Sequence, residues 1–384
     1  MITRDIAYIG VDDTDLDLFE SQYIIPNGIS YNSYLIKDEK IAVMDTADNR
    51  KIDEWLGNLR TALDGRTPDY LVVQHMEPDH AGCIAEILEE YPAIKIVASA
   101  RAIQMMPQFF EGKDFSHNTI AVKEGDTLSL GEHTLQFFMA PMVHWPEVMV
   151  TYDKKDKVVF SADGFGKFGA LSHEEDWACE ARRYYFNICG KYGGPVQALL
   201  KKLATLDVEC ICPLHGPILK ENLGYYIGLY DTWSKYDVET EGVFIAYASI
   251  HGGTAAVANV MAEILREKGA KKVSVADLSR DDMAEAIEDA FRMDKMIVAA
   301  ASYDGGVFPV MHDFLHHLQI KAYQKRRVGI IENGSWAPCA GRVMRGMLEQ
   351  MKDVEIVEPM VTILSRMKQS DRAALEALAD AILK

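Results

Sequence analysis

Residues 74–80 read Gln74-His75-Met76-Glu77-Pro78-Asp79-His80 and directly follow the apolar run Tyr70-Leu71-Val72-Val73. The apolar run predicts a short buried strand. Pro78 lacks an N–H, which disfavours a regular helix and a central strand, so we expect a loop here and a helix from Ala81. Loops at strand ends commonly carry the chemistry of a protein. This loop holds four side chains that can bind a metal ion: His75, Glu77, Asp79 and His80.

The same arrangement is expected at the ends of three later strands. His144 follows an expected strand at 133–139, Asp163 follows one at 158–160, and His215 follows one at 208–212. Taken singly, each residue is more commonly a solvated charge or a hydrogen-bonded loop histidine. Their repetition after four strands favours a shared metal site.

The complete set contains four imidazoles and three carboxylates, with no thiolate. Seven ligands are too many for one tetrahedral ion and suit two ions that share a bridging carboxylate. Nitrogen and oxygen ligands of this kind suit iron, manganese or zinc. Two adjacent ions can hold a small molecule between them.

The composition predicts a cytoplasmic protein of two domains. The 384 residues exceed one typical domain, and a hydrophobic fraction of 48% is ample for packed cores. The net charge of −18 argues against nucleic acid and anionic membranes as partners. The sequence has no apolar run of 18 residues, no signal peptide and no CxxC pair among its six cysteines, so we expect reduced thiols in the cytoplasm.

Residues 1–240 predict a mixed domain in which short strands outnumber helices. Gly131-Glu132 is expected to join two of these strands, 121–130 and 133–139, as a hairpin. The expected strands are 6–11, 30–36, 41–44, 70–74, 95–98, 121–130, 133–139, 148–152, 158–160 and 208–212. The expected helices are 51–63, 81–90, 172–189 and 194–206.

Residues 241–384 predict a regular alternation of five strands and five helices. Such alternation indicates a parallel, doubly wound sheet. The expected strands are 243–248, 272–276, 296–301, 327–332 and 354–361. The expected helices are 254–268, 281–292, 309–322, 340–351 and 370–383.

Three loops after strands of this second domain are candidates for a cofactor site. The first has hydroxyls and glycines at a helix N-terminus, where free N–H groups and the helix dipole favour phosphate, although a capped turn would explain it equally well. The other two carry aromatic side chains that could stack on a ring. The candidate residues are Ser249, Ile250, His251, Gly252, Gly253 and Thr254; then Ser302, Tyr303, Asp304, Gly305 and Gly306; and then Ser335, Trp336, Ala337 and Pro338.

The metal motif resembles that of the metallo-β-lactamase fold, an αββα sandwich with a dinuclear site at its strand ends. The hydrolases of that superfamily carry His-x-His-x-Asp-His, whereas this chain has Glu77 at the second histidine position. An anionic carboxylate favours a redox-active iron pair over zinc. This substitution is the mark of the flavodiiron proteins, also called A-type flavoproteins. The second domain is similar to their flavodoxin-like FMN domain, although many members have Gly-Trp followed by Ser or Gly where this chain has Ser335-Trp336-Ala337-Pro338.

The resemblance implies two domains, 1–240 for a diiron site and 241–384 for FMN. It implies that one iron is bound by His75, Glu77 and His144, the other by Asp79, His80 and His215, and that Asp163 bridges them. In some members of the family a water molecule stands in place of the ligand at the His80 position.

The activity implied by the resemblance is reduction of O2 to water, of NO to N2O, or of both. The choice between the gases stays open because it depends on pocket polarity near groups such as Trp145 and His80. A head-to-tail homodimer, possibly a dimer of dimers, is implied. The sequence ends without a CxxC module, so we expect electrons from a separate donor, either rubredoxin or a reduced deazaflavin.

Two other functions remain open at this stage. One is a dinuclear hydrolase of the metallo-β-lactamase class with an appended flavin domain, which Glu77 disfavours. The other is an electron carrier that uses only its flavin, which the complete ligand set disfavours.

Overall fold

The computed structural model describes residues 2–384. The chain divides into two compact units, one formed by Met1–Tyr185 with Tyr192–Asp231 and the other by Phe186–Lys191 with Thr232–Lys384. Within the described residues, every helix is too short or too polar to cross a membrane.

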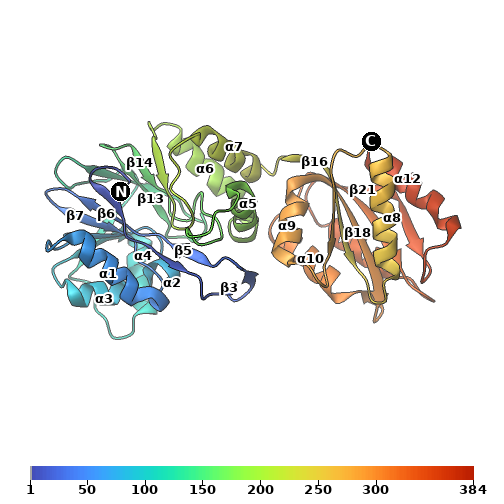
Figure 1. Cartoon of the computed structure of the whole chain (residues 1–384), viewed down its shortest axis with the longest axis horizontal. Coiled ribbons are helices and arrows are strands. Elements are labelled where there is room, and N and C mark those ends of the chain that lie inside the picture. Colours follow the sequence, from blue (N-terminus) through green and yellow to red (C-terminus); the bar gives the residue numbers. More distant parts are fainter. Residues whose placement is uncertain (1) are drawn as a thin grey trace. The chain divides into compact units, whose positions relative to one another are not determined.

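The first unit is a sandwich of two β-sheets (Figure 1), in which α1 and α3 lie beside the first sheet and α6 and α7 lie beside the second. The first sheet has the order β1-β6-β7-β8-β9-β10, and the second has the order β11-β12-β13-β14-β15. Side chains from both sheets, such as Val72 and Val97 from the first and Phe137 and Phe160 from the second, form one buried core. Burial of these apolar faces against each other is the main stabilisation of a sandwich.

The elements of this unit have the following bounds. The first sheet contains β1 (Ile6–Tyr8), β6 (Tyr34–Lys37), β7 (Ile41–Met44), β8 (Tyr70–Val73), β9 (Lys95–Ser99) and β10 (Thr119–Val122). The second contains β11 (Thr127–Ser129), β12 (Thr134–Met139), β13 (Met149–Asp153), β14 (Val158–Phe160) and β15 (Cys210–Cys212). Two small sheets pair β2 (Val11–Asp13) with β5 (Ile29–Tyr31) and β3 (Leu18–Phe19) with β4 (Tyr23–Ile24). The helices up to Ser234 are η1 (Asn49–Lys51), α1 (Ile52–Leu63), α2 (Pro78–Ala81), α3 (Ile84–Glu90), α4 (Ala100–Phe109), α5 (Trp177–Ile188), η2 (Gly190–Tyr192), α6 (Gly193–Leu203) and α7 (Leu223–Ser234), of which the end of α5, most of η2 and the end of α7 belong to the other unit.

The prediction of a loop through Pro78 followed by a helix from Ala81 was wrong in detail. A one-turn helix, α2, begins at Pro78 and contains Asp79 and His80, and a second helix, α3, starts only at Ile84. Proline is well tolerated at the first helical position because the N–H it lacks would have no partner within the helix. The short helix turns Asp79 and His80 away from the direction of the preceding strand.

Three of the expected strands are divided. Segment 6–11 contains β1 and the first residue of β2, which pair with β6 and β5 respectively. Segment 30–36 contains both β5 and β6, and between them Asn32 donates hydrogen bonds to the carbonyls of Pro213 and Gly216, each at 2.8 Å. Segment 121–130 is divided at Gly125, whose φ of +80° lies in the left-handed region. As a result, β10 lies parallel to β9 in the first sheet, and only β11 pairs with β12 in the hairpin. Helices α4 and α7 were not predicted.

The second unit is built around one sheet with the order β17-β16-β18-β20-β21, all in parallel. Helices α8 and α12 cover one face and α9 and α10 the other (Figure 1). The predicted alternation of five strands and five helices is confirmed. Its elements are β16 (Thr240–Ala248), α8 (Gly253–Glu267), β17 (Val273–Asp277), α9 (Met283–Arg292), β18 (Met293–Tyr303), the short β19 (Gly306–Val307), α10 (Pro309–Ile320), β20 (Arg326–Asn333), α11 (Ala340–Leu348), β21 (Val354–Ile363), η3 (Gln369–Asp371) and α12 (Arg372–Ile382).

The segment before β16 is fixed to this sheet by a buried arginine. The guanidinium of Arg326 donates to the carbonyls of Tyr236 and Asp237 and also to those of Phe291 and Met293. A buried guanidinium requires such partners for its donors. The segment that enters β16 is therefore held in place. The C-terminal end of β16 leads into the first candidate cofactor loop.

Candidate functional site

Four of the predicted metal ligands converge at one edge of the sandwich. The Nε2 atom of His75 lies 3.1 Å from Glu77 Oε2 and 3.2 Å from Asp163 Oδ2. The Nε2 atom of His144 lies 3.0 Å and 3.2 Å from the same two oxygens. Ligand atoms bonded at about 2.1 Å to one ion are separated by about 3.0–3.4 Å, so these four atoms are spaced for a common ion.

The other three predicted ligands form a second group. The Nε2 atoms of His80 and His215 lie 3.0 Å apart, and each is 3.2 Å from Asp79 Oδ2. Asp163 reaches this group with its other oxygen, Oδ1, at 3.3 Å from His80 and 3.8 Å from His215. One carboxylate thus faces both groups, with a different oxygen in each.

The buried carboxylates and imidazoles of both ligand groups need positive charge beside them. Both side-chain oxygens of Asp79 and of Asp163 are buried and make no hydrogen bond of normal geometry. A buried carboxylate without donors or a counter-charge is strongly destabilising. Two imidazole nitrogens at 3.0 Å, as in His80 and His215, likewise need a positive ion or a shared proton between them. The donor set therefore fits two metal ions.

The pKa values of the ligands reflect the same concentration of charge. Burial alone would lower the pKa of His80, but the Asp79 and Asp163 carboxylates outweigh it and raise the pKa to about 10. Burial opposes protonation of His144 too, and its contacts with Asp163 and Glu77 raise the pKa to about 9. Burial would raise the pKa of Asp163, yet the neighbouring imidazoles hold it well below its usual range. Protons thus occupy, in the metal-free protein, the region where metal ions fit.

Glu147 is a functional residue that sequence reasoning missed. Its Oε1 accepts a hydrogen bond from His75 Nδ1 at 2.8 Å and another from the backbone N–H of Met76 at 2.9 Å. The side chain is fully buried. A hydrogen-bonded Nδ1 leaves Nε2 of His75 as the lone-pair nitrogen and makes it a better ligand. The signal was present as a carboxylate three residues after His144, on the same loop.

The two groups differ in this outer support. His215 Nδ1 donates to the backbone carbonyl of Ser30 at 2.7 Å, a neutral acceptor, whereas His75 faces the carboxylate of Glu147. Aromatic rings enclose both groups: Trp145 lies edge-on to His75 at 5.2 Å between ring centroids, and Phe19 lies edge-on to His215 at 5.4 Å. These walls limit access of water to the ligands.

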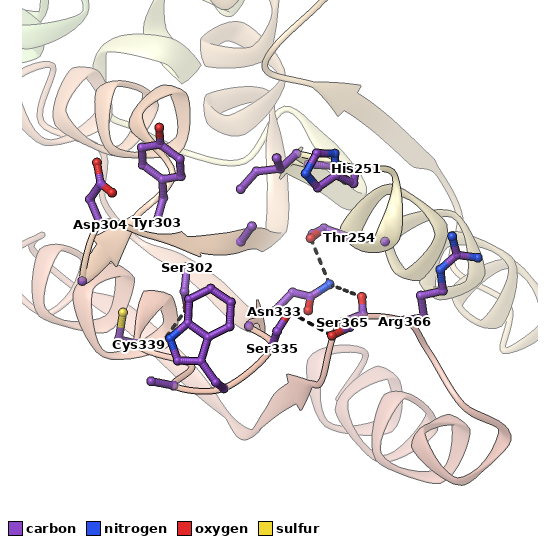
Figure 2. A pocket seen from close by; sticks show the side chains of 18 residues that line it. His251, Thr254, Ser302, Tyr303, Asp304, Asn333, Ser335, Cys339, Ser365 and Arg366 are labelled. Atoms are coloured by element: carbon purple, nitrogen blue, oxygen red, sulfur yellow. Dashed lines mark hydrogen bonds between the residues drawn. The ribbon is translucent and has the colours of Figure 1, made fainter.

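The second unit contains a cavity of about 600 Å³ at the C-terminal ends of its strands (Figure 2). A cavity at this edge, beside the strand-order switch between β16 and β18, is the usual cofactor position in doubly wound sheets. All the predicted cofactor residues line the cavity except Gly252, Gly306 and Pro338. Six further residues also line the cavity: Ala301, Asn333, Gly334, Cys339, Ser365 and Arg366.

The first loop of this cavity fits a phosphate. Helix α8 begins after Gly252, whose φ is +80°, and no side chain caps it. The Ser249 hydroxyl is buried without a hydrogen-bond partner. A Cβ on Gly253 would lie 2.5 Å from the carbonyl oxygen of Ser365, so this position requires glycine. Uncapped helical N–H groups and a free hydroxyl are the donors that bind phosphate oxygens.

The opposite side of the cavity fits a flat aromatic group. Trp336 is 92% exposed and Tyr303 is 44% exposed, which leaves both rings free to pack against a ligand. Asn333 holds the loops together, since its amide lies 3.4 Å from the Thr254 hydroxyl and donates to the carbonyl of Ser365 at 2.9 Å (Figure 2).

Comparisons with known proteins cover both units. The family profile described as ODP family beta lactamase matches residues 29–216. An uncharacterised protein of Methanocaldococcus jannaschii is 30% identical over 357 residues, covering 91% of this chain and 89% of the relative. The anaerobic nitric oxide reductase flavorubredoxin of Escherichia coli is 28% identical over 349 residues, covering 88% of this chain and 72% of the relative. The structure of rubredoxin oxygen:oxidoreductase from Desulfovibrio gigas aligns with a TM-score of 0.93 at 27% identity, covering 100% of this chain and 97% of that one.

Proposed function

This chain belongs to the flavodiiron protein family, and from that premise we propose that it reduces O2 to water, NO to N2O, or both. The predicted fold is confirmed: a metallo-β-lactamase-like unit is followed by a flavodoxin-like unit. The cofactors of the family, a non-haem diiron centre and FMN, fit the two sites described above. The observation that carries the proposal is the position of Asp163, which offers one oxygen to each group of ligands.

The proposed ligands are divided between the two ions as follows. His75, Glu77 and His144 would hold one iron, Asp79, His80 and His215 would hold the other, and Asp163 would be shared between them. When bound, the iron ions would bind and reduce the gas, and FMN would supply them with electrons. The protein fixes the ligands in place, with Glu147 orienting His75, and the aromatic walls keep bulk water away from the reacting gas.

The flavin is assigned to residues 241–384 and the metal ions to residues 1–240. Within the cavity, the loop at 249–254 would hold the phosphate, and Tyr303 and Trp336 would pack against the isoalloxazine ring. A rubredoxin or a reduced deazaflavin is the proposed electron donor. A head-to-tail homodimer belongs to the same proposal, and a stable, active monomer in light scattering would contradict that part of it.

The test is gas consumption by the FMN-loaded, chemically reduced protein, under O2 and separately under NO. Rapid turnover with one gas and slow turnover with the other would assign the substrate. His144→Ala should abolish turnover with both gases while leaving the flavin absorbance unchanged. No turnover with either gas, from protein shown to carry two iron ions, would overturn the reductase proposal.

The same preparations test the hydrolase alternative. Protein that purifies with zinc, lacks iron and cleaves an ester or thioester would support a hydrolase. Retention of all flavin-dependent electron transfer to the gas in His144→Ala and Asp163→Ala would instead support a simple electron carrier.

A further inference from the structure

The loop that fits a phosphate has few charges of its own. Its donors are the first N–H groups of α8 and the hydroxyls of Ser249 and Thr254. The only ionisable side chain within residues 249–254 is His251. A flavin phosphate carries about −1.5 to −2 charges at pH 7. Backbone dipoles alone would leave much of this charge without a counter-charge.

One guanidinium lies beside this loop. Arg366 follows β21, and among the described residues it is the only arginine or lysine that lines the cavity. In Figure 2, Arg366 lies beside α8 at the end of the cavity that holds Thr254 and His251, whereas Tyr303 and Asp304 lie toward the other end. Arg366 is therefore placed near the expected phosphate and away from the expected ring.

The backbone next to Arg366 is held against the phosphate loop. The carbonyl oxygen of Ser365 accepts a hydrogen bond from Asn333 at 2.9 Å and packs so closely on Gly253 that a Cβ would not fit. The Ser365 hydroxyl also bonds to that of Ser335 at 2.9 Å. The segment is thus fixed at one residue from Arg366, while the arginine side chain itself extends into solvent-accessible space.

Arg366 lacks the carboxylate partner that some other arginines of this unit have, and among the described residues Arg266, Arg280 and Arg342 share this lack. Arg327 pairs with Glu355, Arg345 pairs with Glu358, and Arg372 pairs with Glu376. Over the described part of the chain, no ion pair is formed by Arg366. An unpaired guanidinium beside uncapped helical N–H groups is suited to a phosphate, which it can bind through two parallel hydrogen bonds.

We propose that Arg366 recognises the terminal phosphate of the flavin and makes the cavity selective for FMN over riboflavin. This inference rests on the proposed function, because it requires a flavin in this cavity. Arg366 acts on binding and takes no part in the reaction with the gas.

The test is titration of the flavin-free, full-length protein with FMN and with riboflavin, which differ only in the phosphate. Arg366→Gln should weaken FMN binding about 5- to 20-fold, a range set by a charge-assisted hydrogen bond that is partly screened by solvent. Riboflavin binding should stay within about twofold, which also shows that the variant is folded. Arg366→Lys should recover part of the lost affinity because it keeps the charge without the planar fork.

Arg342→Gln is the matched control. Arg342 is exposed on α11, has no ion pair and does not line the cavity. Its replacement removes the same net charge and should leave the affinities for both flavins unchanged. If it weakened FMN binding as much as Arg366→Gln, the effect would be one of overall charge and the proposal would fall.

The remaining outcomes separate this inference from the proposed function. FMN bound equally well by wild type and Arg366→Gln would overturn the role of Arg366 and leave the flavin assignment intact. Equal loss of FMN and riboflavin affinity in Arg366→Gln would show damage to the cavity and would also overturn phosphate recognition. Failure of the wild type to bind either flavin would overturn the flavin assignment together with this inference.

Discussion

The metal-ligand groups and the flavin cavity are built on opposite principles. The metal groups consist of ionisable, mostly buried side chains whose carboxylates need metal ions or protonated imidazoles as counter-charges. The cavity consists mainly of backbone, glycines and hydroxyls on exposed loops, with its aromatic rings open to solvent. Both lie where strands end, because such loops can vary while the sheet beneath them stays rigid.

The two sites should respond differently to substitution. Removing one charge from the metal groups leaves other buried charges without a partner, so a single substitution affects every ligand. The cavity distributes its binding over many weak contacts and depends chiefly on loop shape. Substitutions in the two sites should therefore differ in size and should not affect each other's cofactor.

The largest effect is expected from Asp163→Ala. This change removes the carboxylate that faces both ligand groups, so bound iron should fall from about two ions per chain to below about one, and gas turnover should fall by about 100-fold or more. Flavin content should be unchanged. Metal analysis and flavin absorbance on the same sample measure both. Loss of flavin together with iron would contradict the independence of the two sites.

A smaller effect on iron is expected from Glu147→Ala. Loss of a carboxylate behind a ligating histidine lowers metal affinity by about 10- to 100-fold. Glu147→Gln should cost less, because its amide oxygen still accepts hydrogen bonds from His75 and from the Met76 N–H. The rate of iron release to a chelator measures the difference. Glu132→Gln is the control, since Glu132 is exposed and pairs only with Lys155. If Glu147→Ala released iron at the wild-type rate, Glu147 would have no role in holding the metal.

Gly253→Ala tests the cavity alone. The new Cβ would lie 2.5 Å from the Ser365 carbonyl oxygen, and overpacking of this kind costs about 1–3 kcal/mol. The phosphate loop would have to shift to relieve the contact, so FMN affinity should fall about tenfold while iron is retained. Gly346→Ala is the matched control, because Gly346 lies in α11 with no atom within 4 Å of its added Cβ. That variant should keep FMN and gain up to about 1 kcal/mol of stability, since alanine favours helix. Unchanged FMN affinity in Gly253→Ala would contradict the tight fit of the loop.

The smallest expected effect is on the pH dependence of stability. In the metal-free protein the pKa values of His80 and His144 are about 10 and about 9, above the value of about 6.5 expected in the unfolded chain. Protonation of these rings therefore stabilises the fold fully below about pH 6.5, and this contribution is lost as the pH rises through 9 and 10. Thermal unfolding of metal-free protein should show this loss. Iron-loaded protein, whose rings are already deprotonated, should not show it, and parallel curves for the two forms would contradict the prediction.

Much of the metal site could be predicted from the sequence because its ligands directly follow short apolar runs. Strand ends of one sandwich meet at one edge, so His75, His144, Asp163 and His215 were expected to be neighbours, and the structure brings them together. The local backbone was less predictable. Whether Pro78 ends a loop or starts a helix depends on the tertiary position of Asp79 and His80, which no local pattern contains.

The missed residues share a physical reason. Glu147 contacts His75, which lies 72 residues earlier in the chain, and Arg366 lines a cavity formed by loops far from it in the sequence. Neither residue belongs to a motif of fixed spacing. Segment 30–36 divides at Asn32 because the amide binds the loop of His215, more than 180 residues away along the chain. Helical periodicity predicted the second unit well, since its strands and helices alternate regularly and each helix covers the strand beside it.

Anomalous X-ray diffraction at the iron edge, on crystals of the iron-loaded protein, would test the shared role of Asp163 directly. We expect two iron peaks, one among His75, Glu77 and His144 and the other among Asp79, His80 and His215, with the Asp163 carboxylate between them. A single peak, or iron bound away from Asp163 in protein that still consumes O2 or NO, would contradict this expectation.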